Sequence, residues 1–211
     1  MQDPIVGIDL GTTNSLVAFA DARGPRVLGP GTGLVPSVIR VDTSGVVVGE
    51  RAKAERAQHA HTTAASVKRL IGRSALEVRD AGAPHGLRVV DGPRGLAAVG
   101  LAERTLLPQE LSAHVLRELA RMASAELGVA VRRAVITVPA YFDDGQRQAT
   151  RDAARLAGLD AVRIVNEPTA AALAYGIGRG HRAAENNNKL TKENQILRSI
   201  VARIDPASFD E

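Results

Sequence analysis

The chain contains no cysteine among its 211 residues, and aromatic side chains make up only 2% of it. The absence of cysteine excludes a disulfide framework, a thiolate metal site and a cysteine nucleophile. Because hydrophobic residues still make up 45%, the core must be built from Val, Leu, Ile and Ala. No apolar run approaches the roughly 18 residues that indicate a membrane span, so no membrane partner is expected.

Charge of one sign is not concentrated anywhere in the chain. A net charge of +4 and a pI near 9.9 would by themselves suggest nucleic acid as a partner. Acidic and basic residues are interleaved, however, and almost no aromatic side chains are present to stack on bases. Nucleic-acid binding is therefore not expected. The N-terminus, Met1 to Pro4, lacks the features of a signal peptide, and we expect a soluble, cytoplasmic protein.

Lysine is scarce in residues 1–180, which contain twenty arginines but only Lys53 and Lys68. Keeping a lysine at position 68, next to Arg69, indicates a need for a compact ammonium there. The alternative, from the residues alone, is a surface lysine on an amphipathic helix. The five histidines have no zinc-site spacing, so no metal role is assigned to them.

Strand and helix patterns alternate along residues 1–180, which predicts an α/β fold. A short Gly/Asn turn between the first two strands predicts a hairpin. The predicted strands are Ile5–Leu10, Leu16–Ala20, Ser37–Val41, Val46–Val48, Ala134–Val138 and Ala161–Val165. The predicted helices are Glu50–His59, Pro108–Leu127 ended by Gly128, Asp143–Ala157 ended by Gly158, and 169–175. Residues 72–100, rich in Gly and Pro, predict loops and short strands.

Three local patterns support these helices. Leu116, Leu119, Ala123 and Leu127 form one stripe at helical spacing. Asp143 and Gln146 have the spacing of a capping box. The sequence 166–168, Asn-Glu-Pro, fits an N-cap followed by the first turn of a helix, where proline does little harm.

Composition changes abruptly after Gly180. Asparagine occurs twice in residues 1–180 and four times in residues 181–211, where Lys189 and Lys192 also lie. Apolar residues between Ile196 and Ile204 form an amphipathic stripe. Residues 181–211 are therefore predicted to be a polar linker and a short amphipathic helix of unrelated origin.

The turn from Asp9 to Asn14, with the sequence DLGTTN, is the first candidate for chemistry. A tight glycine turn presents backbone N–H groups to phosphate oxygens, and the hydroxyls of Thr12 and Thr13 add donors. An aspartate at the end of the preceding strand could hold Mg²⁺ through water. A plain hairpin with polar turn residues explains the same six residues, and the residues alone leave both interpretations open.

Four segments together resemble the ATPase domain of the DnaK-type heat-shock chaperones, in the family's order and at about its spacing. They are GIDLGTTNS (7–15), VKRLIGR (67–73), VITVPAYFDDGQRQA (135–149) and NEPTAAALAYG (166–176). The resemblance covers residues 5–178. Within the family, SVKRLIGRS (66–74), AYFDD (140–144) and DAARLAGL (152–159) are most similar to the branch that serves iron–sulphur cluster assembly.

The resemblance implies ATP or ADP with Mg²⁺ as cofactors and a role for each matching residue. Gly11, Thr12, Thr13 and Asn14 would bind phosphate, and Asp9 would face the hydration shell of the metal. Lys68 would reach the γ-phosphate and the attacking water, and Glu167 would order the metal-bound water. Locally, an acidic residue in the first turn of a helix explains Glu167 equally well.

Four further residues are implied to serve communication with partners. Pro139 and Arg147 would form a switch that passes the nucleotide state to a partner domain. Tyr141 and Arg163 would lie near the surface read by a J-domain co-chaperone or an interdomain linker. From the residues alone, Tyr141 could equally be a core aromatic and Arg163 a solvated charge at a strand end.

The implied fold is the first lobe of an actin-like ATPase. Residues 1–36 and 110–180 would form a ribonuclease-H-like subdomain, with a smaller α/β subdomain inserted at 37–109. The second phosphate turn of the family, of the type DLGGGT, does not occur between Gly176 and Glu211. We therefore expect the second lobe to be absent, the chain to be truncated, and an exposed lobe face that allows self-association.

Three functions are compatible with these sequence features to different degrees. The first is an ATP-dependent chaperone for unfolded or scaffold protein clients, with ATP hydrolysis weak or absent in this chain alone. The second is a non-catalytic fragment that binds co-chaperones or other partners. The third, a small-molecule kinase of the same superfamily, is disfavoured by the VPAYF and NEPTAAALAYG segments.

Overall fold

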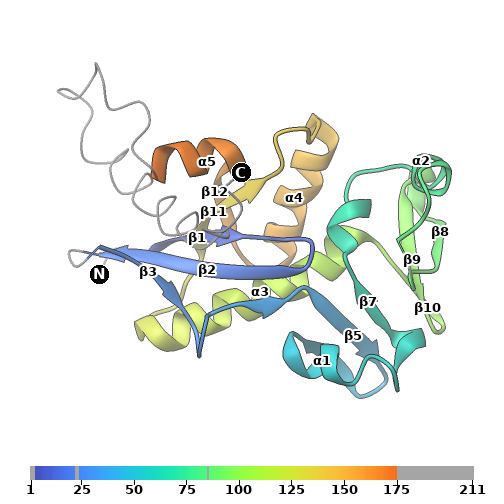
Figure 1. The fold of residues 1–211 in the computed structure, drawn as a ribbon, viewed down its shortest axis with the longest axis horizontal. Coiled ribbons are helices and arrows are strands. Elements are labelled where there is room, and N and C mark those ends of the chain that lie inside the picture. The colour runs from blue at the N-terminus through green and yellow to red at the C-terminus, as the bar shows by residue number, and fades with distance from the viewer. Residues whose placement is uncertain (1–2, 22–23, 85, 175–211) are drawn as a thin grey trace, which may run out of the picture.

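A six-stranded sheet forms the centre of the structure, a computed structural model that describes residues 3–21, 24–84 and 86–174 (Figure 1). The strand order is β12-β11-β1-β2-β3, and β4 pairs with β2. β11 and β12 run parallel to β1, whereas β2 is antiparallel to β1, as the predicted hairpin requires. The strands are β1 Ile5–Asp9, β2 Asn14–Asp21, β3 Gly24–Leu28, β4 Val35–Pro36, β11 Arg133–Val138 and β12 Asp160–Asn166. The predicted α/β class is confirmed.

Helices lie on both faces of this sheet. Along β11, Ala134 and Ile136 join the core that contains α3 (Pro108–Leu127) and α4 (Asp144–Leu156). Val135, between them, packs with Ala170 of α5 (Glu167–Ala174). Because successive residues of a strand point to opposite faces, α5 lies on the face opposite α3 and α4. Figure 1 shows α5 and α3 on opposite sides of the strands.

The part of the chain between β4 and α3 forms two smaller sheets. One has the order β6-β5-β7 and the other β10-β9-β8, and among the described residues neither pairs with the six-stranded sheet. Their strands are β5 Val38–Asp42, β6 Gly45–Val48, β7 Thr63–Ala65, β8 Val89–Asp91, β9 Ala97–Leu101 and β10 Arg104–Leu106. The helices between them are α1 Glu50–Ala54 and α2 Ala75–Asp80, with 3-10 helices η1 Ala60–Thr62, η2 Val67–Leu70 and η3 Pro93–Gly95.

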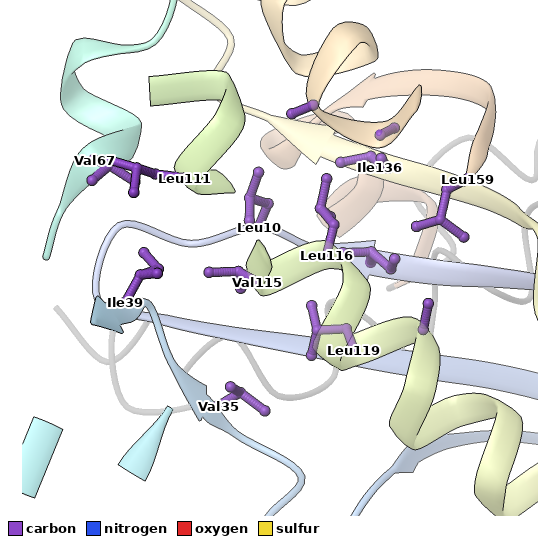
Figure 2. Packing of buried hydrophobic residues seen from close by; sticks show 14 of the residues in the cluster. Leu10, Val35, Ile39, Val67, Leu111, Val115, Leu116, Leu119, Ile136 and Leu159 are labelled. Atoms are coloured by element: carbon purple, nitrogen blue, oxygen red, sulfur yellow. The ribbon is translucent and has the colours of Figure 1, made fainter. Parts of the chain in front are cut away.

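Helix α3 packs against both parts of the molecule. Leu111 and Val115, near its start, lie beside Val67 and Ile39 of the smaller part, and Leu116 faces Ile136 of the large sheet (Figure 2). All of these side chains are 3% exposed or less. The two parts therefore share one continuous hydrophobic core. The stripe predicted on this helix is buried at Leu116, Leu119 and Ala123, and Gly128 ends the helix in the left-handed conformation.

Two helix predictions differ from the structure. The helix predicted over 50–59 is only α1, because residues 56–58 are exposed and bring no apolar side chain to the core, so tertiary packing does not extend the helix. Helix α2 lies inside the segment predicted as loops and short strands. A capping box of Ser74 and Glu77 starts it, and Ala75 and Val78 bury one face. The Ser-x-x-Glu spacing was a signal for this helix in the sequence.

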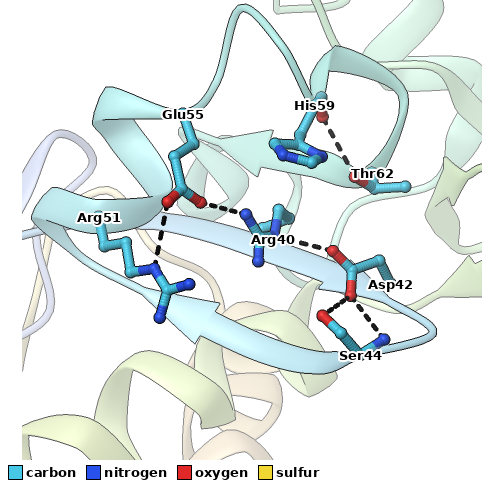
Figure 3. Close-up of polar contacts among 7 residues, drawn as sticks. All are labelled: Arg40, Asp42, Ser44, Arg51, Glu55, His59 and Thr62. Atoms are coloured by element: carbon cyan, nitrogen blue, oxygen red, sulfur yellow. Dashed lines mark hydrogen bonds and ion pairs between the residues drawn. The ribbon is translucent and has the colours of Figure 1, made fainter.

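A buried guanidinium joins α1 to the first small sheet (Figure 3). Arg40 of β5 forms ion pairs with Asp42, 2.8 Å away, and with Glu55, which also accepts a hydrogen bond from Arg51 at 3.1 Å. Asp42 in turn accepts from the backbone N–H of Ser44 at 2.8 Å. Because Arg40 is 6% exposed, these carboxylates supply the counter-charges that a buried cation requires.

Among the described residues, no helix is both long enough and apolar enough to cross a membrane. The linker and short helix predicted for residues 181–211 lie outside the described residues, as does residue 175 at the end of the predicted helix 169–175.

Candidate functional site

The turn between β1 and β2 is closed by its own backbone and by two buried serines. A Cβ on Gly11 would lie 2.0 Å from the carbonyl oxygen of Asn14, so no other residue fits there without opening the turn. The N–H of Gly11 donates to Ser15 Oγ at 3.1 Å, and the hydroxyl of Ser37 donates to the carbonyl of Gly11 at 2.8 Å. The two hydroxyl oxygens lie 2.9 Å apart. These contacts hold the turn in one shape.

This arrangement divides the roles of the turn residues. Because the N–H of Gly11 is already donated to Ser15, Gly11 contributes the shape of the turn rather than a donor for a ligand. Thr13 and Asn14 are exposed and Thr12 is half-buried, so their hydroxyl and amide groups face solvent at the end of the sheet.

Asp9 is the last residue of β1 and lies at the carboxyl end of three parallel strands. Its Oδ1 accepts a hydrogen bond from Thr137 Oγ1, on neighbouring β11, at 2.8 Å. Burial raises the pKa of Asp9 above the ordinary value of an aspartate and outweighs the lowering by the Lys68 ammonium and by the Thr137 hydrogen bond. Glu167 raises the pKa of Asp9 further. The charges of Lys68 and Glu167 therefore both act on Asp9.

Lys68 belongs to η2 and is 6% exposed. Its Nζ lies 2.7 Å from Oε1 of Glu167, the first residue of α5 and 99 residues further along the chain. The same Nζ is 5.9 Å from the centroid of the Phe142 ring, which is within the range of a cation–π interaction. An ammonium carries three N–H donors, so donors remain after the bond to Glu167.

A pocket of about 880 Å³ adjoins these groups, with Thr12 and Lys68 in its wall. Arg69, Tyr141 and Gln146 also line it, whereas Asp9 and Glu167 do not. Its lining contains basic side chains and no carboxylate, so the pocket favours an anionic ligand.

The carboxylates of the site fit one kind of metal ion. Mg²⁺ is usually held by one or two carboxylates together with waters and substrate phosphates. Asp9 and Glu167 provide two carboxylates near the turn, and the described residues contain no group of three or more His, Cys, Asp or Glu side chains that could hold a metal ion. This donor set fits Mg²⁺ bound through water and phosphate.

The connection between β11 and α4 brings Pro139 and Arg147 together around Phe142. The carbonyl of Pro139 accepts from the Phe142 N–H at 3.2 Å, and Arg147 Nε donates to the carbonyl of Phe142 at 3.0 Å. The guanidinium of Arg147 also donates to Oδ1 of Asn166 at 2.7 Å. The side chain of Asn166, expected to cap the next helix, therefore accepts from Arg147, and α5 begins at Glu167.

Tyr141 and Arg163 are exposed on different elements. Tyr141 lies in the β11–α4 connection, is 82% exposed, and meets the Phe142 ring edge to face with centroids 5.7 Å apart. It is therefore not a core aromatic. Arg163 lies within the edge strand β12, opposite Val135 and directly after a bulge in the pairing with β11.

Several residues of the site were not assigned by sequence reasoning. Thr137 could have been found as the polar residue inside the apolar run 134–138. Ser37 and Phe142 carried no local signal, because their partners lie far away in the chain. Gln146 was recognised only as a capping residue, although its side chain also contacts the segment that follows Lys68.

Comparisons with known proteins point in one direction. The model of the family described as Hsp70 protein matches residues 5–197. The chain is 53% identical over 175 residues to the chaperone protein HscA homolog of Bordetella petrii, and the matched region covers 82% of this chain and 28% of that protein. It is 51% identical over 179 residues to the HscA homolog of Chromobacterium violaceum, with coverage of 83% and 28%. It is 46% identical over 176 residues to the chaperone protein DnaK of Deinococcus radiodurans, with coverage of 82% and 28%. The chain thus spans a little more than a quarter of the length of these relatives.

Proposed function

The chain belongs to the Hsp70 protein family. We therefore propose that it binds ATP or ADP with Mg²⁺ and acts as the nucleotide-binding part of an ATP-dependent chaperone. One observation carries the proposal. A buried ammonium, Lys68, pairs with Glu167, and its charge acts on Asp9, which precedes a turn whose position 11 accepts only glycine. Three segments far apart in the sequence supply these groups, and charge-dense phosphates are the ligand that they suit.

We propose that the fold is the first lobe of an actin-like ATPase. Residues 1–36 and 110–180 would form its ribonuclease-H-like subdomain, and residues 37–109 the inserted α/β subdomain. The change in strand pairing supports this division, because β4 at 35–36 pairs with β2, whereas β5 to β10 pair only among themselves in the described residues.

In this proposal each group of the site has one task. The hydroxyl groups of Thr12 and Thr13 and the N–H groups of Thr12, Thr13 and Asn14 bind phosphate oxygens, and Gly11 shapes the turn. Lys68 directs its remaining N–H donors to the γ-phosphate, where a compact cation offsets charge that develops during phosphoryl transfer. Glu167 fixes Lys68 and orders water. Bound Mg²⁺, held through water by Asp9, would neutralise charge on the phosphates.

Calorimetric titration of the 211-residue chain with Mg·ATP tests the proposal. We expect saturable binding that Lys68→Ala weakens at least tenfold. Lys53→Ala is the matched control, because Lys53 is an exposed lysine on α1 that pairs with the exposed Glu50 at 3.7 Å. Absence of heat up to millimolar nucleotide, or equal weakening by both variants, would contradict the proposed nucleotide site.

We further propose that the chaperone belongs to the branch that serves iron–sulphur cluster assembly, with a J-domain co-chaperone and unfolded or scaffold proteins as partners. The motif resemblance supports this branch, and so does the higher identity to HscA homologs, at 53% and 51%, than to a DnaK at 46%. Capture of this chain by an immobilised J-domain should be lost in Arg163→Ala. Arg104→Ala, an exposed arginine on β10, should not change it.

Binding of partners without nucleotide chemistry remains the second candidate function. The observation that favours it is the 82% exposure of the Tyr141 ring, because exposed aromatics are enriched at protein interfaces. J-domain capture that persists in Lys68→Ala, together with no Mg·ATP binding by the parent chain, would favour this function over the first.

A further inference from the structure

The first turn of α4 holds both segments that carry the Lys68–Glu167 pair. The side-chain amide of Gln146 donates to the carbonyl of Ile71, three residues after Lys68, at 3.3 Å. The next residue, Arg147, donates to Asn166, directly before Glu167, at 2.7 Å. Two consecutive residues of one helical turn therefore bind the two segments that carry the partners of the ion pair.

The Lys68 segment cannot hold its own position. η2 is a 3-10 helix of four residues, and such short pieces are not stable by themselves. Left-handed residues lie on both sides of it, Ser66 at φ 58° and Gly72 at φ 70°. The path of the backbone between them must therefore be set by contacts with other elements.

Helix α3 packs against η2, and the backbone of α4 makes a close contact just after it. A Cβ on Gly72 would lie 2.6 Å from Cα and 2.8 Å from the backbone N of Gln146. The backbone at Gly72 and the backbone of α4 are therefore in direct contact. The Gln146 side chain is 8% exposed, and its Oε1 accepts from the Asp143 N–H at 3.2 Å while its Nε2 donates to Ile71. Both ends of the amide are used, one within α4 and one toward the Lys68 segment. Ile71 also packs with Phe142, the ring beneath the Lys68 ammonium.

We propose that Gln146 is a positioning residue that sets the location of Lys68 relative to Glu167. It acts through the Ile71 carbonyl and the Gly72 contact and does not touch Lys68 itself. That a correctly placed Lys68 binds phosphate rests on the proposed function. That Gln146 places Lys68 does not.

The test observes the lysine side chain directly in the nucleotide-free 211-residue chain. The chain has four lysines, at 53, 68, 189 and 192, so labelling with ¹³C,¹⁵N-lysine gives four sets of side-chain signals in NMR spectra. Lys68→Arg removes and thereby assigns the Lys68 signal. Glu167→Gln defines how far that signal moves when the ion pair is lost.

Two substitutions at position 146 separate the possible causes. Gln146→Met removes the N–H donor without adding charge. Gln146→Glu removes the same donor but keeps an oxygen that can accept from Asp143, as capping-box glutamates do. We expect both to move the Lys68 signal in the direction of Glu167→Gln and by most of its displacement. Gln148→Glu is the matched control, because Gln148 is exposed on the same helix and donates to Asp152, at 3.2 Å and away from the Lys68 segment.

A positioning role also predicts that the effects are not additive. In the double variant Gln146→Met/Glu167→Gln, the Lys68 signal should lie where Glu167→Gln alone puts it. Glu167→Gln has already removed the Lys68–Glu167 ion pair, so the change at position 146 has no ion pair to displace. The proposal is wrong if folded Gln146→Met keeps the parent Lys68 signal, if only the charged variant moves it, or if Gln148→Glu moves it equally. Should Gln146→Met fail to fold, Gly72→Ala probes the same contact from the other side and must move the signal in the same direction.

This test and the nucleotide titration fail independently. Displacement of the Lys68 signal in a chain that does not bind Mg·ATP would support the positioning and overturn the proposed function. Equal Mg·ATP affinity of parent and Gln146→Met, with an unmoved Lys68 signal, would overturn the positioning and support the nucleotide site.

Discussion

At the scale of single residues, Gly11 has the tightest steric requirement of the glycines in the described residues. An added methyl group would lie 2.0 Å from the Asn14 carbonyl oxygen, and that oxygen belongs to backbone that cannot rotate away. We expect Gly11→Ala to open the turn, to destabilise the protein by about 2 kcal/mol and to abolish Mg·ATP binding. Urea unfolding and calorimetric titration measure the two effects.

Gly145→Ala is the comparison for that experiment. Gly145 lies within α4, and its added Cβ would meet only the Asp143 Oδ1, at 3.2 Å. Alanine is favoured over glycine inside helices, so we expect unfolding free energies within about 1 kcal/mol of the parent. If Gly11→Ala behaves like Gly145→Ala, the turn is more adaptable than its geometry indicates.

The Lys68–Glu167 pair allows a second prediction at this scale, because its partners differ in exposure. The Lys68 side chain is 7% exposed and that of Glu167 is 33% exposed. Glu167→Gln leaves a buried ammonium without its counter-charge, which we expect to cost about 1–3 kcal/mol. Lys68→Met leaves Glu167, which water still reaches, and buried Asp9, which can take up a proton once the Lys68 charge is gone, so it should cost less.

Urea unfolding of the double variant Lys68→Met/Glu167→Gln completes the cycle. Removing both charges should cost less than the sum of the single changes, because no unpaired buried charge remains. Additive costs would show that the two side chains do not interact in solution.

At the scale of elements, the Arg40 network connects strand β5 to the segment that follows α1 (Figure 3). Hydrogen bonds from Ser44, and to a smaller extent the charge of Arg40, lower the pKa of Asp42 below the ordinary value of an aspartate. A hydrogen bond from Arg51, followed by the charge of Arg40, lowers the pKa of Glu55. Both carboxylates are thus stabilised in their ionised form in the folded protein.

The sign of the resulting pH dependence follows from these lowered values. Below about pH 4.3 the unfolded chain takes up protons at these groups before the folded protein does. Their contribution to stability is therefore complete above that pH and is lost as pH falls through the folded pKa values. The urea midpoint of Glu55→Gln should fall less steeply between pH 5 and 3 than that of the parent. Parallel curves would mean that Glu55 does not contribute.

At the scale of the whole molecule, α3 makes two sets of strands into one cooperative unit. Its buried residues contact both the large sheet and the β5 to β9 region, and the core between them is continuous (Figure 2). We therefore expect amides of β1 and β11 and amides of β5 and β9 to exchange with solvent through the same global opening. Native-state hydrogen exchange in low urea measures the opening free energy of each strand.

Leu119→Ala provides the perturbation for that experiment. Leu119 is fully buried in α3, and its truncation should cost about 2–5 kcal/mol. The protection of both sets of strands should fall by the same amount. Loss confined to β5 and β9 would show that residues 37–109 open as a separate unit.

Self-association through the face that a second lobe would cover, which is expected to include α5, stays a prediction at this scale. The exposed large apolar side chains of the described residues are Leu34, Val46, Leu76, Tyr141 and Leu156, and none of them belongs to α5. Sedimentation equilibrium of the 22.2 kDa chain over a range of concentrations measures the association directly.

Much of the fold could be predicted because its signals are local. Short apolar runs predicted β1, β2, β11 and β12, and the stripe through Leu116 predicted the buried face of α3. Gly128 and the Asp143–Gln146 pair marked a helix end and a helix start. The extent of α1 and the presence of α2 were predicted wrongly, because tertiary burial decides whether such short helices persist.

The sequence by itself determined the α/β class, the glycine turn and the family, because each depends on residues that are neighbours in the chain. Only the tertiary structure decided that Lys68 is buried against Glu167, 99 residues away, and that Gln146 holds the segment between them. A lysine has the same local pattern on a solvated helix as in an ion pair. Its environment depends on chain segments that meet only when the sheets pack around α3, so no local pattern could have distinguished the two.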